Sequence, residues 1–302
     1  MDWEAWFRNA ADPPSNNEDD KRDSTERQIK DALRAYEPLQ GKPYRVYVKG
    51  SYANNTNVRL DYDVDIAVEY EGCFYSDLIF DLEGTPKEDI GVSASDDPYT
   101  PSLLRADVLG ALEATFGNTS VERGNIALRV RDSKTTLPAD VVPCWEYRRY
   151  ERLDQSGIAV FQKGSKIFPK GGSPTTNFPD QQKSNGNQKN VDTGYRYKYM
   201  VRAIKKLHSR LIDEGLLANG LPSYLIECLV YNVPKNQFGH DTYVADVRAI
   251  LATIFNATLS IGGWNDWEEV NGLKYLFRGG PAWTHEQVNQ FAGSAWDHVG
   301  FT

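Results

Sequence analysis

Hydrophobic and polar positions alternate along several short segments in the first half of the chain. The two-residue period and β-branched residues typical of strands occur in YRVYVKG, which ends at Gly50, and in DVDIAVEY, which starts at Asp63. The same signals recur in ALRVRD and PADVVPCWEY. Helical spacing occurs in 102–116 and in TERQIKDALRAY, which Asp23 or Ser24 could cap. This half therefore predicts a mixed α/β fold.

The second half has the 3.6-residue period of helices instead. Segments with this period are 193–215, 223–231, 242–256 and a last one near 283–299. The preceding residues, 163–190, are rich in Gly, Lys, Ser, Asn and Pro and have no period. We therefore predict an α/β core over 1–162, a loop or linker over 163–190 and a helical domain over 191–302, with a ligand cleft between the two domains.

Composition and charge narrow the possible functions. Hydrophobic residues make up 40% and aromatic residues 12% of the chain, which is enough for a real core. The net charge is −8, yet residues 148–210 contain 14 basic and 4 acidic residues, which leaves −18 elsewhere. The negative charge of the rest of the chain repels polyanions, whereas the basic segment favours a small anion such as a nucleoside triphosphate. The alternative interpretation of the basic segment is a solvated surface without a ligand. No apolar run approaches the roughly 18 residues of a membrane span, and the acidic N-terminus favours a cytoplasmic location.

A Gly-Ser pair stands at the end of the first predicted strand. Gly50 and Ser51 are followed by YANNTNV, which could begin a short helix. A glycine before a helix start offers free backbone N–H groups to a phosphate, and a serine hydroxyl adds a donor. An ordinary strand-to-helix turn has the same pattern, so the pair alone indicates a phosphate site only weakly.

Three aspartates lie on predicted strands. Asp63 and Asp65 alternate on one strand and therefore point to the same face, where two carboxylates repel unless a cation lies between them. Mg²⁺ prefers such oxygen ligands. Asp140 has apolar neighbours on another strand and could complete a two-metal site. The alternatives are that Asp63 and Asp65 are solvated residues at a strand edge and that Asp140 is a hydrogen-bonded core residue. Asp61 falls on the same alternating positions as Asp63 and Asp65, but we expect it in the preceding turn.

Taken jointly, these motifs resemble a known superfamily. The segments that carry the resemblance are KGSYANNTNVRLDYDVDIAV, TLPADVVPCWEYRRY, YRYKYMVRAIKKLHSRLID and PSYLIECLVYNVPKNQF. They are similar to the DNA polymerase β-type nucleotidyltransferases, and within these to clade E of the bacterial cGAS/DncV-like nucleotidyltransferases (CD-NTases). The resemblance implies an α+β fold, with a polymerase β-like core of mixed sheet and helices, an N-terminal spine helix and a C-terminal helical domain.

The resemblance also implies roles for residues of the core. In such enzymes three carboxylates bind two Mg²⁺ ions, for which Mn²⁺ is a possible substitute, and they correspond to Asp63, Asp65 and Asp140. The pair that holds the triphosphate corresponds to Gly50 and Ser51.

Further roles fall in the second half of the chain. A phosphate-binding lysine corresponds to Lys205, beside the apolar stripe of its helix, where its stem can pack. A serine that touches phosphate and a tyrosine that stacks on a base correspond to Ser223 and Tyr224; a helix cap and a packing residue are the alternatives. An amide in KSNGNQKN could read uracil, because an amide both donates and accepts. Asn185 is our candidate; its rivals are Asn187, Asn190 and a simple Asn-Gly turn.

The function implied is the joining of two NTPs into a cyclic dinucleotide, a second messenger that acts on a separate effector protein in bacterial anti-phage (CBASS) defence. Clade E implies pyrimidine-containing products, from UTP with ATP or from UTP alone. The alternatives are single-nucleotide transfer to a small molecule, a protein or an RNA 3′ end, and a catalytically silent nucleotide sensor. Without a His/Cys cluster for a zinc-containing insertion, we expect no activation by DNA.

Overall fold

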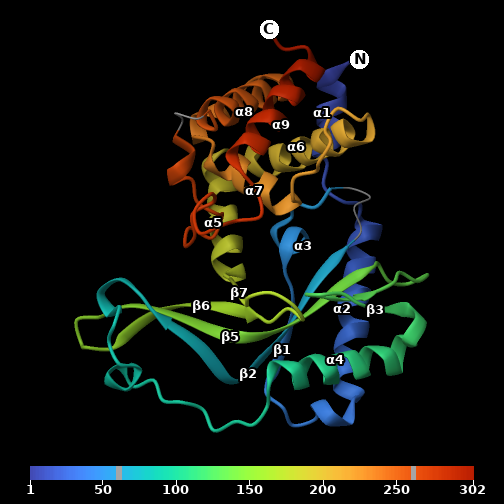
Figure 1. Ribbon diagram of the computed structural model, residues 1–302. Coiled ribbons are helices and arrows are strands. Elements are labelled where there is room, and N and C mark those ends of the chain that lie inside the picture. Colours follow the sequence, from blue (N-terminus) through green and yellow to red (C-terminus); the bar gives the residue numbers. More distant parts are fainter. Residues whose placement is uncertain (59–62, 260–262) are drawn as a thin grey trace. The chain divides into compact units, whose positions relative to one another are not determined.

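The computed structural model describes residues 1–58, 63–259 and 263–302 (Figure 1). The chain divides into two compact units. The sheet unit comprises Asn16–Lys49 and Tyr62–Asp180, and the helical unit comprises Met1–Ser15, Gly50–Asp61 and Gln181–Thr302. Among the described residues, no helix is both long and apolar enough to cross a membrane. The α+β class predicted from the sequence is confirmed, whereas the functional division at residues 162 and 191 stays a prediction.

The sheet unit is built on one mixed sheet (Figure 1). Its described strands are β1 (Tyr44–Val48), β2 (Val64–Leu78), β3 (Val121–Arg123), β4 (Leu128–Val130), β5 (Ala139–Leu153), β6 (Ala159–Ile167) and β7 (Thr175–Asn177). The order is β1-β2-β5-β4-β3, and β6 joins β5 to β7. Strands β2 and β5 are parallel, whereas the other neighbouring strands are antiparallel. The strands that carry the predicted carboxylates are therefore adjacent at the centre of the sheet.

Two long helices accompany this sheet and contact one another: α2 (Asn16–Ala35) and α4 (Pro101–Phe116). Helix α4 lies where its periodicity predicts it. Helix α2 begins earlier than predicted, so a cap at Asp23 or Ser24 is wrong. Its polar first turn contains Glu18 and Asp19, whose negative charges favour a helix N-terminus.

The helical unit contains α1 (Trp3–Ala11), α3 (Gly50–Asn54), α5 (Pro179–Asp192, from Gln181 onward), α6 (Arg196–Asp213), α7 (Ser223–Asn232), α8 (Tyr243–Ala257) and α9 (His285–Val299). Short 3-10 turns occur in the helical unit at Lys235–Gln237 and Gly263–Asp266. In the sheet unit they occur at Glu37–Leu39, Phe80–Leu82, Lys87–Ile90 and Asn118–Ser120. The four helices predicted in the second half of the chain are confirmed as α6 to α9.

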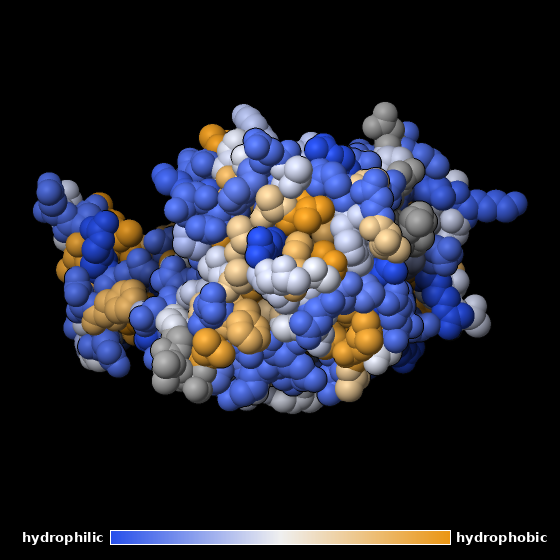
Figure 2. Space-filling view, turned by 90° about the horizontal axis from the view of Figure 1, so that it is seen from above, coloured by the Kyte–Doolittle hydropathy of each residue, from blue (hydrophilic) through white to orange (hydrophobic). Residues whose placement is uncertain are grey.

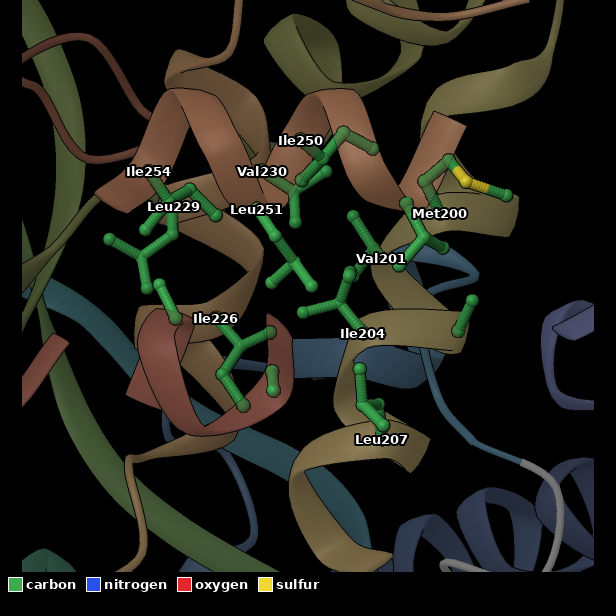
Figure 3. Packing of buried hydrophobic residues seen from close by; sticks show 14 of the residues in the cluster. Met200, Val201, Ile204, Leu207, Ile226, Leu229, Val230, Ile250, Leu251 and Ile254 are labelled. Atoms are coloured by element: carbon green, nitrogen blue, oxygen red, sulfur yellow. The ribbon is translucent and has the colours of Figure 1, made fainter. Parts of the chain in front are cut away.

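Burial in the helical unit follows the helical periodicity. From above, most of the visible surface is hydrophilic, and hydrophobic side chains gather in small patches (Figure 2). Inside, the apolar faces of α6, α7 and α8 meet in one cluster that includes Met200 and Ile226, with Ile204 directed toward Leu251 (Figure 3). These side chains are at most 1% exposed. Their removal from water stabilises the unit that holds α3 and α7.

The prediction of a loop over 163–190 is wrong for most of that range. It contains the end of β6, all of β7 and most of α5. Strand β6 pairs with β5 and β7, and α5 buries Gly186, where an added Cβ would come within 4 Å of Val270 and Tyr197. Long-range contacts therefore override the low intrinsic propensity of this polar, glycine-containing segment.

Candidate active site

The Gly-Ser pair lies where β1 gives way to α3. Gly50 has a φ of +67°, in the left-handed region that glycine adopts with little strain. The backbone N–H of Lys49 donates to the carbonyl of Asp65 at 2.9 Å, and that of Thr56 donates to the carbonyl of Ser51 at 2.9 Å. These bonds fix both ends of the turn, and Ser51 itself remains partly exposed.

The structure brings the three predicted carboxylates together on the sheet. Asp65 of β2 and Asp140 of β5 are register partners on adjacent parallel strands, so their side chains share one face. Asp63 comes directly before β2, and Arg129 Nη2 of β4 donates to its two carboxylate oxygens at 2.6 and 2.7 Å. Arg129 is also the register partner of Asp140. Asp61 lies outside the described residues.

The charges of this group are mutually dependent. Burial raises the pKa of Asp140, and the nearby charge of Asp63 raises it further, while Arg129 and Lys49 act in the opposite direction. Asp63 in turn raises the pKa of the Arg129 guanidinium. Aspartate carboxylates are hard oxygen donors, which is the kind that Mg²⁺ selects. By ligand type the residues present therefore fit a divalent cation, although the described group whose carboxylate oxygens all lie within 4.8 Å of one another is a different one.

A second acidic group, which the sequence analysis did not single out, lies further along the same strands. Carboxylate oxygens of Glu69, Glu71 and Glu146 lie within 4.8 Å of one another and by spacing could hold a metal. However, Lys163 Nζ lies 3.9, 3.1 and 3.0 Å from these three carboxylates, and Arg45 Nε lies 2.9 Å from Glu69. A metal there would have to displace a lysine ammonium, so these contacts favour a salt-bridge network.

Ser223 and Tyr224 begin α7. Ser223 is exposed, and the helix is capped by Pro222 without a side-chain bond, so the serine is not the N-cap. The Tyr224 hydroxyl donates to Glu269 Oε2 at 2.9 Å, and burial raises the pKa of this phenol far above its ordinary value. The tyrosine ring is thus held in one orientation.

Lys205 is placed differently from the expectation that its ammonium reaches a cleft. The residue is only 4% exposed. Its Nζ donates to the carbonyl of Thr56 at 3.0 Å and lies 3.6 Å from Glu227 Oε2. Contact between this ammonium and a triphosphate stays a prediction.

The three candidate asparagines all lie in α5, so the alternative of a simple Asn-Gly turn is wrong. Asn185 Nδ2 donates to the carbonyl of Val270 at 2.9 Å. Asn187 Oδ1 accepts from Lys198 Nζ at 2.6 Å, and Asn190 Oδ1 accepts from the backbone N–H of Lys198 at 3.1 Å. The carboxylates belong to the sheet unit, whereas the Gly-Ser pair, Lys205, Ser223, Tyr224 and Asn185 belong to the helical unit.

The mixed sheet, the neighbouring aspartates and the helical unit agree with the class that the sequence resembles, the nucleotidyltransferases. Residues 184–300 match the family of the cGAS/DncV-like nucleotidyltransferase C-terminal helical domain. The chain is 37% identical over 301 residues to the cyclic dipyrimidine nucleotide synthase CdnE of Legionella pneumophila, covering 99% of this chain and 98% of the relative. It is 36% identical to the cyclic dipurine nucleotide synthase of Elizabethkingia meningoseptica, covering 96% and 95%.

A solved structure agrees with these relatives. The CdnE c-UMP-AMP synthase of Rhodothermus marinus, with Apcpp and Upnpp, has a TM-score of 0.83 and 29% identity, covering 99% of this chain and 98% of that one. The chain belongs to clade E of the bacterial cGAS/DncV-like nucleotidyltransferases, the CdnE cyclic dinucleotide synthases.

Proposed function

We propose that this enzyme joins two NTPs, at least one of them UTP, into a cyclic dinucleotide in a Mg²⁺-dependent reaction. The observation that carries the proposal is the pairing of Asp65 with Asp140 in register, with Asp63 beside them. In each of two successive steps, a ribose hydroxyl oxygen bonds to an α-phosphorus, pyrophosphate leaves, and the hydroxyl proton is released.

The three aspartates would hold the divalent ions. When bound, such ions neutralise charge on the triphosphate and make the acceptor hydroxyl more acidic. The positive charge of Arg129 lies beside Asp63, so a divalent ion would compete with the guanidinium for this carboxylate. The half-buried Asp140 must be ionised to act as a ligand, and its raised pKa makes this ionisation depend on pH.

The helical unit supplies the proposed nucleotide contacts. Gly50 and Ser51 offer backbone and hydroxyl donors to the triphosphate, and the exposed Ser223 offers a hydroxyl at the start of α7. Tyr224, whose hydroxyl donates to Glu269 and whose ring packs against the core, is the residue that we propose to stack on a base.

Family membership leaves the bases open, because relatives of nearly equal identity are named for dipyrimidine and for dipurine products. We favour a pyrimidine because Asn185 can match the uracil edge. With one N–H given to the Val270 carbonyl, its amide keeps a second N–H and a carbonyl oxygen. The product is then proposed to signal to a separate effector protein in anti-phage defence.

The test is to incubate the purified protein with Mg²⁺ and each labelled NTP, alone and in pairs, and to identify phosphatase-resistant products by mass. A cyclic product that contains UMP supports the proposal. Addition of one nucleotide to another acceptor, without a cyclic product, would contradict it. Omission of UTP from a mixture of four NTPs should sharply reduce the yield.

A further inference from the structure

We infer that Lys205 is a positioning residue, which holds the Gly50–Ser51 turn through Thr56 and Glu227 and does not itself bind the triphosphate. The inference rests on the proposed role of this turn in phosphate binding. It concerns contacts that lie entirely within the helical unit.

Lys205 forms a buried charge pair with Glu227. Lys205 of α6 and Glu227 of α7 have side chains that are 5% and 3% exposed, with Nζ and Oε2 3.6 Å apart. Both bond to the same residue: Lys205 Nζ donates to the carbonyl of Thr56 at 3.0 Å, and Thr56 Oγ1 donates to Glu227 Oε2 at 2.6 Å. Thr56 is 0% exposed. The ammonium therefore lies inside protein, among protein partners.

Thr56 connects this charge pair to the Gly50–Ser51 turn. The backbone N–H of Thr56 donates to the carbonyl of Ser51 at 2.9 Å. Asn54, the last residue of α3, donates from Nδ2 to Glu227 Oε1 at 3.4 Å. The charge pair thus contacts the end of α3 directly through Asn54. It is connected to the Ser51 carbonyl through Thr56, whose backbone N–H donates to that carbonyl.

A second cation of α6 supports the same segment. Arg202 is 2% exposed, and its Nη1 donates to the carbonyl of Asn55 at 2.6 Å while its Nε donates to the carbonyl of Ala11. Asn55 has a φ of +53°, in the left-handed region that asparagine adopts more readily than most residues with a side chain. Two cations of α6, three residues apart, therefore bind consecutive carbonyls beyond α3.

The physical reason for a positioning role is the cost of burying charge. A buried ammonium is tolerated only with partners, and removal of one partner leaves the other charge uncompensated. A triphosphate that approached Lys205 Nζ would have to compete with Glu227 and the Thr56 carbonyl inside the unit. Lys205 and Glu227 should consequently act as one functional pair, which holds the chain segment that follows the Gly50–Ser51 turn.

A double-mutant cycle tests this inference. The variants are Lys205→Met, Glu227→Gln and the double variant, with Lys206→Met on the same helix as the control for loss of charge. The readouts are KM and kcat for NTPs, binding of a fluorescent non-hydrolysable ATP analogue, and the melting temperature. We expect each single variant to lose about ten- to a hundredfold in kcat/KM, and the double variant to lose no more than the worse single variant. Lys205→Arg should retain most activity.

The inference would be overturned if the losses in kcat/KM multiply in the double variant, so that Lys205→Met costs as much in the Glu227→Gln background as in the wild type. That result would favour a direct phosphate contact. Ser51→Ala separates this outcome from failure of the proposed function. If Ser51→Ala leaves analogue binding unchanged, the Ser51 hydroxyl is not a phosphate contact, which contradicts that part of the proposed function and not the role of the Lys205–Glu227 pair. The neutral Met/Gln pair leaves no buried charge, so the double variant remains interpretable if either single variant melts early.

Discussion

The guanidinium of Arg129 binds both carboxylate oxygens of Asp63, with Nη2 at 2.6 Å from one and 2.7 Å from the other. Both side chains are nearly half exposed, so the pair by itself contributes at most about 1 kcal/mol to stability. Its position is more informative than its energy, because Arg129 is also the register partner of Asp140. A cation of the chain therefore lies against the carboxylates that we assign to the metal.

Arg129→Gln should slightly lower the melting temperature of the metal-free protein and tighten Mg²⁺ binding, by roughly tenfold if about 1.4 kcal/mol of competition is removed. Calorimetric titration with Mg²⁺ in the absence of NTP measures this directly. Arg131→Gln is the matched control, since Arg131 pairs with Glu122 at 2.8 Å instead. Unchanged Mg²⁺ affinity, together with a raised NTP KM, would show that Arg129 acts on the nucleotide.

Asp140→Asn should abolish product formation while the protein stays folded. Because burial raises the pKa of Asp140 above its ordinary 3.8, the folded protein binds this proton more tightly than the unfolded chain does. The stability of the metal-free wild type should therefore fall as pH rises from about 3.8 through the raised pKa, and the variant should lack that contribution. Thermal melts across this window without metal, compared between the two proteins, check the sign. Near-normal activity of the variant would make Asp140 a core residue.

The network around Lys163 gives the opposite pH dependence. Although burial opposes it, Lys163 and Arg148 lower the pKa of Glu146, so this carboxylate stabilises the fold above about 4.5, and the contribution is lost as pH falls. Lys163→Met should cost about 1–2 kcal/mol at pH 7, and the difference from wild type should shrink in acid.

Two comparisons make that prediction specific. Lys166→Met, on the same strand, removes an equal charge without touching this network and should cost less. Glu146→Gln should retain cyclic product, whereas Asp65→Asn should lose it. Loss of activity in Glu146→Gln without a change in melting temperature would assign the metal to the glutamate group.

The sheet and its aspartates were predictable because their signals are local. The two-residue period places Asp63 and Asp65 on one face, and the apolar neighbours of Asp140 indicate a buried strand. Their pairing across β2 and β5 joins residues about 75 positions apart and needed the resemblance to a known family. Glu69 and Glu71 repeat the same alternation, and no local pattern shows that Lys163 pairs with them.

In the helical unit, the burial of polar residues and the structure of α5 could not be predicted from local sequence patterns. The apolar stripe of α6 is visible in its spacing, but the burial of Lys205 depends on Thr56, far away in the chain, and on Glu227. Likewise, α5 has the composition of a linker, yet it is a helix with Gly186 buried and with Asn185 bonded to the distant Val270 carbonyl. In both cases tertiary partners decide the structure, and they leave no periodic trace.

The last prediction concerns the base. Asn185→Ser removes the amide that donates to the Val270 carbonyl, and with it the N–H and oxygen that we assign to uracil. UTP incorporation should therefore fall more than ATP incorporation, by at least the value of one of these hydrogen bonds, about 0.5–1.5 kcal/mol, or roughly two- to tenfold. Competition between labelled UTP and ATP measures the ratio. Asn187→Ser tests the neighbouring rival, whose oxygen is bound to Lys198. An unchanged ratio would leave Asn185 as a packing residue of α5, whereas strict purine use by the wild type would make the pyrimidine proposal wrong and leave the three aspartates in their role.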